Sequence, residues 1–173
     1  MKMFKRFAAA LLVGVMALAM LTACGERTSK IGKEFEDAAL AAINTARGAA
    51  GAEALKNDET LRDKALGQLC YINGDGTIAE ENAGVMTVLA KDETKKTVKL
   101  LVISVLTEKD KDKDGVLKAK EINADVLKQV SGGLNNQAAA NFQKVGIATK
   151  VVNGKTYTAA AFEMEVPASA LEH

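Results

Sequence analysis

Histidine is almost absent from this chain. The single copy, His173, ends the sequence in Leu171-Glu172-His173, which resembles the start of a vector-derived hexahistidine tail. We therefore set residues 171–173 aside from the fold, and the rest of the chain contains no imidazole. Catalytic schemes that use histidine as the general base are thereby excluded.

The apolar run near the start of the chain is too short to span a membrane. It covers residues 7–21, about 15 residues, whereas a spanning helix takes about 18 to 20. Lys2, Lys5 and Arg6 precede it, and small residues follow it. A basic start, a short apolar run and small residues before a cleavage site are typical of an export signal. We predict that residues 1–23 are a signal peptide that is removed.

The signal ends in Leu21-Thr22-Ala23-Cys24, which resembles a bacterial lipobox. The resemblance implies that Cys24 is acylated, so that the protein is exported and lipid-anchored to the outer face of a bacterial membrane. An ordinary secretory cleavage site beside a chance cysteine is the alternative. Residues 24–33 are polar and predict a flexible tether. Acylation would leave Cys70 without a cysteine partner, and its apolar neighbours favour a buried structural thiol over a reactive one.

An excess of either charge is missing as well. Without the three basic residues of the signal, the 23 basic residues of the chain become 20, against 22 acidic ones. No basic patch stands out, so nucleic acid is not expected as a partner. Residues 34–167 suit one domain of ordinary size with its own core.

The first part of this domain predicts two helices. Apolar residues recur at three- and four-residue intervals over 34–46, which is typical of one buried helix face. A second helix is predicted over 58–71, with Asp58 as its N-cap. The glycines of Asn73-Gly74-Asp75-Gly76 then indicate a turn. Residues 83–90 are apolar and fit either a strand or a short helix.

The second part ends in a different kind of structure. Helical spacing of apolar residues over 94–108 and 120–130 predicts two more helices. Residues 145–152 and 156–166 are rich in strand formers, and Asn153-Gly154 between them is the favoured two-residue hairpin turn. Helices first and strands last predict an α+β domain.

A charged run over residues 110–121 separates the two later helices and matches the twelve-residue EF-hand loop. Carboxylates at loop positions 1, 3 and 5 converge on one cation, and glycine at position 6 permits a sharp turn. A backbone carbonyl at position 7, a water-mediated contact at 9 and a bidentate glutamate at 12 complete the shell. The spacing predicts a site for calcium as the cofactor. The ligand positions are Asp110, Asp112, Asp114, Val116, Lys118 and Glu121.

A solvated run of charges is the alternative interpretation of this segment. A charge run, however, gives no reason for glycine at position 6 and glutamate at position 12 between two amphipathic helices. EF-hand loops usually come in pairs, but Asn73-Gly74-Asp75-Gly76 is too short for a second loop and lacks the terminal glutamate. A lone site is expected to be weak, in a range of about 0.1 to 1 mM for extracellular modules.

Several segments of the chain resemble the CAP superfamily, which includes cysteine-rich secretory proteins and plant pathogenesis-related proteins. The family opens with a helix that carries an I/V-N-x-x-R-x-x-x-G pattern, and later has a G-E-N-I motif, an S-P-G-H segment and an F-x-x-V-G-V strand. The similar segments are 40–65 with Asn44 and Arg47, Glu81-Asn82-Ala83, 131–133, 141–147 and the hairpin up to Phe162.

This resemblance implies a CAP-like α-β-α sandwich around an antiparallel sheet, with an inserted helix-loop-helix at about 94–130. Family members hold a divalent cation in a cleft with two histidines and acidic residues. Leu134 stands where the second histidine would be, so the transition-metal site is expected to be lost. Glu81 and Asn82 are possible cleft residues, and a structural role at a strand start is the alternative for Glu81.

Together, these features predict a membrane-tethered extracellular lipoprotein that is not an enzyme. Its CAP-like domain would bind an unknown extracellular ligand or protein, with one EF-hand-like calcium site. The alternative is a cell-envelope hydrolase or peptidase with a histidine-free site, for example Ser104 or Ser131 with a lysine, or Glu80 and Glu81 as acid and base. No serine stands in a G-x-S-x-G or S-x-x-K context, which favours the binding function.

Overall fold

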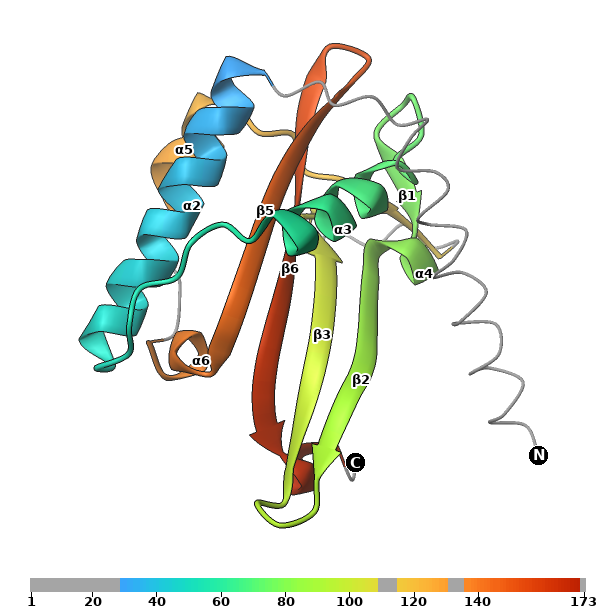
Figure 1. Ribbon diagram of the computed structural model, residues 1–173. Helices are drawn as coiled ribbons and strands as arrows, with labels where there is room; N and C mark the ends of the chain where they lie inside the picture. Colours follow the sequence, from blue (N-terminus) through green and yellow to red (C-terminus); the bar gives the residue numbers. More distant parts are fainter. Residues whose placement is uncertain (1–28, 109–114, 131–135, 172–173) are drawn as a thin grey trace, which may run out of the picture.

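The computed structural model describes residues 29–108, 115–130 and 136–171. Its elements are α2 (Lys30–Ala49), α3 (Glu59–Leu69), β1 (Thr77–Ala79), α4 (Glu80–Ala83), β2 (Gly84–Asp92), β3 (Thr97–Val105), β4 (Val116–Lys118), α5 (Ala124–Gln129), α6 (Asn136–Ala140), β5 (Phe142–Val152), β6 (Lys155–Pro167) and the 3-10 helix η2 (Ala168–Leu171). Four antiparallel strands form one sheet in the order β2-β3-β6-β5, and β1 and β4 form a second, smaller sheet. This arrangement confirms the predicted α+β class (Figure 1).

Helices pack on both faces of the four-stranded sheet. Tyr157 and Ala159 of β6 belong to one core with the apolar residues of α3. Their neighbours Ala160 and Phe162 pack in another core, with Ile43 of α2 and residues of α6. Because successive residues of a strand point to opposite faces, α3 covers one face and α2 with α6 covers the other.

Helix α2 begins at Lys30, inside the segment 24–33 that was expected to be a tether. The Ser29 hydroxyl caps it by accepting a hydrogen bond from Gly32 N at 3.1 Å. The same hydroxyl lies 2.8 Å from Thr156 Oγ1 at the start of β6. The first residue of the described domain is therefore held at the end of the sheet where β5 turns into β6 (Figure 1).

Helix α3 has the N-cap that the sequence predicts. Asp58 Oδ1 accepts a hydrogen bond from Leu61 N at 3.0 Å. The start of the helix lies directly on β5 at Gly146, where a Cβ atom would come within 2.2 Å of Arg62 N. Only glycine leaves room for this contact between helix and strand backbones.

The predicted hairpin near the end of the chain is confirmed. Strands β5 and β6 are joined by Asn153 and Gly154, which both have positive φ angles, 48° and 79°. Two consecutive residues with positive φ define the type I′ turn that matches the twist of the strands.

The predicted helix over 94–108 is wrong, because the segment contains the β2–β3 turn and strand β3. Leu101 and Ile103 face the α3 core, whereas Leu100 is 3 % exposed on the opposite face. A strand that is buried on both faces carries a nearly continuous apolar run, which periodicity cannot distinguish from a helix. Residues 83–90, left open between strand and helix, lie mainly in β2.

The predicted helix-loop-helix at 94–130 is correspondingly only partial. Its second helix, α5, begins at Ala124 and not near Lys120, because Asn123 caps it by accepting hydrogen bonds from two backbone N–H groups at 3.0 Å. Its first half contributes β3 to the middle of the four-stranded sheet. The segment is thus an integral part of the fold and not an appended unit.

Candidate functional site

Two loops that lie far apart in the sequence meet through the smaller sheet. Strands β1 and β4 pair antiparallel, with Ile78 opposite Leu117. Gly76 and Gly115 each stand two residues before these partners, and both have positive φ angles, 86° and 72°. When each glycine is numbered as position 6 of an EF-hand loop, the paired residues both fall at position 8.

Reciprocal backbone hydrogen bonds join the two loops. Glu80 N donates to Gly115 O at 2.9 Å, and Ala119 N donates to Gly76 O at 2.9 Å. Each donor lies four residues after the glycine of its own loop. The two loops are therefore related by an approximate two-fold axis, and each fixes the backbone of the other.

The first of these loops is closed by its own side chains. Asp75 Oδ1 accepts hydrogen bonds from Thr77 Oγ1 at 2.6 Å and from Thr77 N at 3.0 Å. The hydrogen bond from the Thr77 hydroxyl is the main reason that the pKa of Asp75 is lowered. A side chain at Gly76 would come within 2.5 Å of the Tyr157 hydroxyl, so this loop is also packed tightly against β6.

Sequence reasoning missed this partner loop. As a calcium loop, the Asn73–Gly76 segment is too short and lacks the terminal glutamate. The shared signal was Gly76-Thr77-Ile78 beside Gly115-Val116-Leu117, a positive-φ glycine two residues before a large aliphatic residue.

The predicted calcium ligands lie partly outside the described residues. Asp110, Asp112 and Asp114 belong to residues 109–114, which the structure does not describe. Val116 and Lys118 lie in β4, and the Lys118 carbonyl accepts a hydrogen bond from Glu108 N at 2.8 Å. Across residues 29–108, 115–130 and 136–171, no group of three or more His, Cys, Asp or Glu side chains could hold a metal ion.

Glu121, the predicted bidentate ligand, lies beside a cation. Its Oε2 is 3.3 Å from Lys155 Nζ at the start of β6. The hydrogen bond and charge of Glu121 raise the pKa of Lys155. Both side chains are about half exposed, so the pair is open to solvent and to competing ions.

The predicted cleft residues form a short helix instead of a strand start. Glu81 is exposed on α4, and Asn82 offers its backbone carbonyl to the buried Gln68 side chain.

Asn44 and Arg47, the motif residues of the first helix, have structural roles. Asn44 makes two hydrogen bonds to the backbone of Leu55, at 2.7 and 2.8 Å. The 6 % exposed Arg47 donates to the Ala139 carbonyl at 2.9 Å and to Glu53, Ala140 and Phe142.

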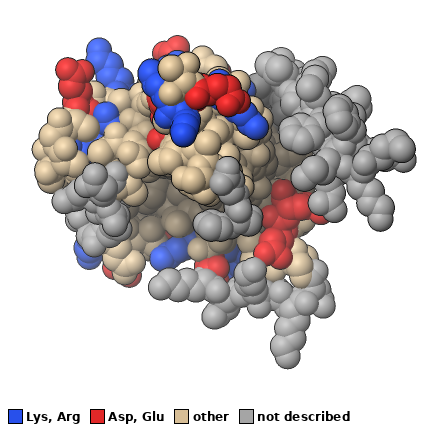
Figure 2. Space-filling view, turned by 90° about the horizontal axis from the view of Figure 1, so that it is seen from below, with Lys and Arg blue, Asp and Glu red and all other residues tan. Residues whose placement is uncertain are grey.

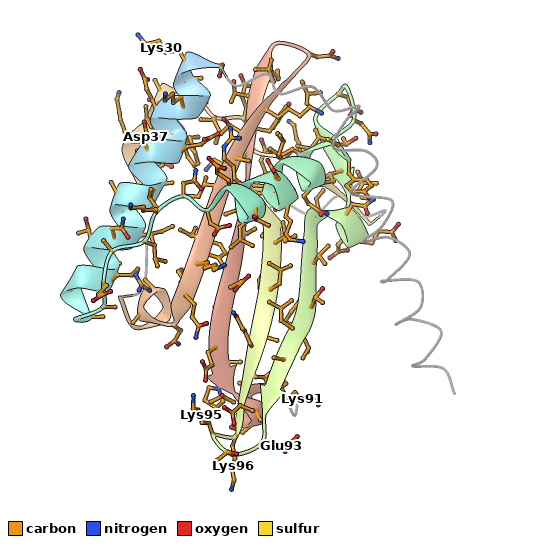
Figure 3. The ribbon with its side chains drawn as sticks, in the orientation of Figure 1. Lys30, Asp37, Lys91, Glu93, Lys95 and Lys96 are labelled. Atoms are coloured by element: carbon orange, nitrogen blue, oxygen red, sulfur yellow. The ribbon has the colours of Figure 1, made fainter. Side chains whose placement is uncertain are left out.

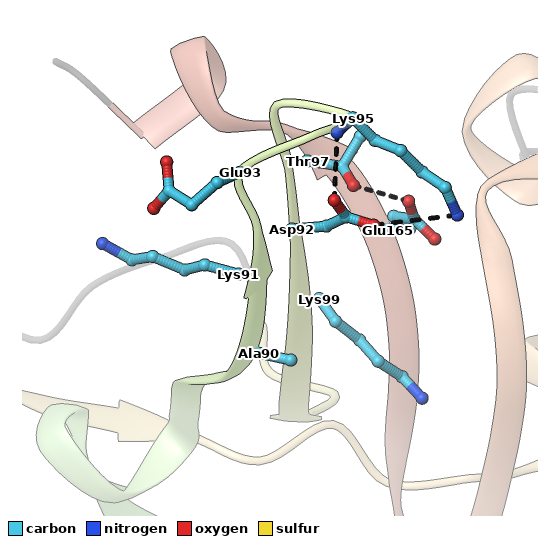
Figure 4. Close-up of a pocket in the computed structure, with 8 residues that line it drawn as sticks. All are labelled: Ala90, Lys91, Asp92, Glu93, Lys95, Thr97, Lys99 and Glu165. Atoms are coloured by element: carbon cyan, nitrogen blue, oxygen red, sulfur yellow. Dashed lines mark hydrogen bonds and ion pairs between the residues drawn. The ribbon is translucent and has the colours of Figure 1, made fainter.

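A hollow of about 410 Å³ lies at the opposite end of the sheet (Figure 4). Its lining contains three basic and three acidic residues, Lys91, Lys95 and Lys99 with Asp92, Glu93 and Glu165. Lys95 Nζ is 3.8 Å from Asp92 Oδ2, and the Thr97 hydroxyl donates to Glu165 at 2.6 Å. The bonds from Thr97 and Gln143 lower the pKa of Glu165. Figure 2, which views the molecule from this end, shows Lys and Arg side chains interspersed with Asp and Glu. The hollow offers no field of one sign to attract a charged ligand.

A buried charged group joins α2, α3 and β5 and was not anticipated from the sequence. Glu36 is 8 % exposed, and its Oε1 accepts hydrogen bonds from Thr149 N at 2.8 Å and Thr149 Oγ1 at 2.7 Å. Its Oε2 pairs with Arg62 Nε at 3.3 Å. Because Glu36 already accepts hydrogen bonds at both oxygens, its role in this position is structural.

The residues considered for nucleophilic chemistry are not assembled into a triad or dyad within the described part of the chain. The Ser104 hydroxyl is exposed on β3 and lies 3.4 Å from the Val105 carbonyl. Ser131 lies outside the described residues. Cys70 is disulfide-bonded, which corrects the expectation of a thiol without a cysteine partner. Cys24 is the other cysteine of the chain, so this bond and acylation of Cys24 exclude each other. Lys150 Nζ lies 3.5 Å from the Cys70 sulfur, and burial lowers the pKa of this lysine.

The predicted anchor, Cys24, precedes the described residues. Among the helices that the structure describes, none combines the length and the apolar content needed to cross a membrane. Comparison with known proteins gave no match to a family model, a curated protein or a solved structure. The similarity to the CAP superfamily stays a prediction.

Proposed function

We propose that this protein is a lipid-anchored extracellular binding protein that is stabilised by one calcium ion in the loop 110–121. The observation that supports the proposal is the reciprocal pair of hydrogen bonds between the loops of Gly76 and Gly115. A second loop that fixes the backbone of the first is the usual support of an EF-hand site, and the sequence alone offered none. The loop with Gly76 supplies this support without the terminal glutamate of a calcium loop.

The second half of the proposed calcium loop is held in place before any ion binds. Gly115 has the positive φ that position 6 requires, and β4 is paired with β1 over its whole length. Binding then requires no rearrangement of the backbone of β4, which lowers the entropic cost of capture. Placement outside the cell also favours binding, because extracellular modules use calcium sites with dissociation constants of about 0.1 to 1 mM.

Thermal unfolding with calcium and with chelator tests the proposal. We expect calcium at about 100 times its dissociation constant to stabilise the wild type by about 2.7 kcal/mol. Asp112→Ala should lose this shift, because position 3 no longer supplies an oxygen ligand. Asp125→Ala is the matched control, since Asp125 is exposed outside the loop and its variant should keep the full shift. Equal melting temperatures with calcium and chelator in the wild type would remove calcium from the function.

Lys155 offers a second, more specific test. Its ammonium group lies 3.3 Å from the carboxylate that calcium would need at position 12. Lys155→Met removes this competitor and should tighten calcium binding, measured by calorimetric titration. Glu121→Gln should weaken binding instead. The proposed ligand set is wrong if the two variants bind calcium equally well.

Acylation of Cys24 would leave only residues 25–28 between the lipid and Ser29. Extended chain covers at most about 3.3 to 3.6 Å per residue, so the α2 end of the domain would lie close to the membrane. Figure 3 shows Lys30 at this end and Lys91, Lys95 and Lys96 at the other. The β2–β3 end would thus face outward. Mass spectrometry of the mature N-terminal peptide tests acylation, and a Cys24 peptide linked to Cys70 by a disulfide would contradict it. Cys24→Ala should move the protein from the membrane to the soluble fraction.

A further inference from the structure

Strand β2 is an edge of the four-stranded sheet, and no strand of the described residues pairs with its outer side. It runs over nine residues, and β3 is its single neighbour in the sheet. Within the described residues, the backbone groups of β2 that point away from β3 make no hydrogen bond. An unpaired row of N–H and C=O groups is a template for another strand.

The side chains of this strand are apolar as well as exposed. Most of the exposed large hydrophobic residues of the described chain lie on it, and Met86 is the most exposed at 64 %. These residues are Val85, Met86, Val88 and Leu89. A natural edge strand is usually protected by inward charges, proline or a covering segment. Between Gly84 and Ala90 this strand has no charged residue and no proline, and no segment that the structure describes covers its outer side, although it has a bulge after Val88.

We propose that β2 pairs antiparallel with β2 of a second copy of this chain. The strand is self-complementary about Thr87. A two-fold axis at this residue sets Met86 opposite Val88 of the partner subunit, and Val85 opposite Leu89 of the partner subunit. Every central cross-strand pair apart from Thr87 with itself is then apolar, and such pairs stabilise a sheet. The same surface patch is used by both copies, as in the commonest class of soluble oligomer.

Charge complementarity supports the same arrangement. Exposed Glu81 lies just before β2 and exposed Lys91 lies near its end. Neither side chain forms an ion pair inside the described part of the chain. Antiparallel pairing about Thr87 sets Lys91 opposite Ala83 of the partner subunit and diagonal to Glu81 of the partner subunit, at both ends of the contact. The exposed Glu93 would lie opposite Glu81 of the partner subunit, and this like-charge pair would end the pairing there. A parallel arrangement would place like charges together.

Sedimentation equilibrium of the full chain in detergent tests the pairing. We expect a dimer for the wild type and a monomer for Met86→Lys, because the lysine would bring like charges to the two-fold contact. Thr45→Lys adds the same charge on the exposed side of α2 and should stay dimeric. A wild type that is monomeric throughout, or a dimer that Met86→Lys leaves intact, would overturn the proposal. This result does not depend on calcium.

Cross-linking identifies the occupant of the edge. Residues opposite one another in an antiparallel pair have Cβ atoms about 4.5 to 5.5 Å apart, close to disulfide geometry. Thr87→Cys should therefore give a covalent dimer of the full chain under mild oxidation, whereas Thr45→Cys should give no more than the unsubstituted chain. Capture of a different protein by Thr87→Cys in its native membrane would assign the edge to another partner and overturn the pairing of two copies.

Discussion

The two edge strands of the four-stranded sheet, β5 and β2, differ in whether the backbone groups on their outer sides have hydrogen-bond partners. Several backbone groups in the middle of the outer side of β5 have partners from the chain before α3 or from α2. Asp58 N donates to Val145 O at 2.7 Å, and the Asn57 amide makes two hydrogen bonds to Ile147, at 2.7 and 3.0 Å. The Glu36 carboxylate accepts from Thr149 N at 2.8 Å. Strand β2 has no such cover among the described residues.

This difference predicts which substitutions change the stability of the fold and which change what the protein binds. The β5 edge is closed by Glu36 of α2 and by the chain just before α3, so a change there disturbs the backbone of the sheet and the helix packing beside it. The β2 edge contacts only β3, so a change there should alter what the protein binds and leave its folding nearly intact. Four substitutions test this division, in order of decreasing effect on stability.

Gly146→Ala should have the largest effect. Its Cβ would lie 2.2 Å from Arg62 N and from Leu61 C, both backbone atoms that cannot move without shifting α3. Overpacking costs about 1 to 3 kcal/mol and occasionally more, and we expect at least the upper value here. Gly84→Ala on β2 is the matched control, because its Cβ would meet Ile103 O at an ordinary 3.7 Å. Urea unfolding should separate the two variants, and equal losses would contradict the division between the edges.

Asn57→Ala should have the next largest effect. It leaves the N–H and C=O groups of Ile147 without their partners at the β5 edge. Unsatisfied buried groups cost about 1 to 3 kcal/mol. Asn57→Asp keeps the acceptor for Ile147 N and loses only the donor, so it should recover part of this loss in the same unfolding assay. An aspartate no better than alanine would show that the hydrogen bond to the N–H does not stabilise the edge.

Met86→Ser tests the open edge. Met86 is 64 % exposed, and surface substitutions of this kind usually stay within about 0.5 kcal/mol. We expect the free energy of unfolding of the dilute protein to stay within this range, while association of the chain weakens. A large loss of stability in the monomer would mean that Met86 belongs to the core and not to an interaction surface.

Thr97→Val tests the interior of the sheet and should have the smallest effect. It removes the main hydrogen bond that lowers the pKa of Glu165, so this pKa should rise toward its ordinary value near 4.5. A lowered carboxyl pKa stabilises the fold above the unfolded-state value, and this contribution is lost as pH falls through the folded-state pKa. The variant should therefore lose stability less steeply below pH 4.5. Carboxyl NMR titration measures the shift, and an unchanged pKa would contradict the assigned cause.

Local signals in the sequence predicted the parts of the fold that local chemistry determines. Asp58 before α3 and Asn153-Gly154 before β6 act on their immediate neighbours, and both were identified from the sequence. Strand β3 was misread as a helix because its residues are buried on both faces, and that burial depends on strands and helices distant in the sequence. Its β-branched residues favour a strand, whereas the spacing of its apolar residues favours a helix.

Only one of the two paired loops of the candidate site was predicted, for the same reason. The spacing of Asp110 to Glu121 is visible in the sequence, but the loop that supports it pairs across about 40 residues, Ile78 with Leu117. Nothing in the local sequence around Glu36 indicated that it would close the β5 edge. Its partner, Thr149, lies at the far end of the chain.

The hydrogen bond between Ser29 and Thr156 also decides how the domain would respond to mechanical tension. Under the proposed anchoring, a partner held at β2 and a membrane that holds the lipid would pull on opposite sides of the sheet. The load would pass from β2 through β3 and β6 to Thr156 and Ser29, across the β2–β3 and β3–β6 ladders. The hydrogen bonds of each ladder would share this load along the length of the strands.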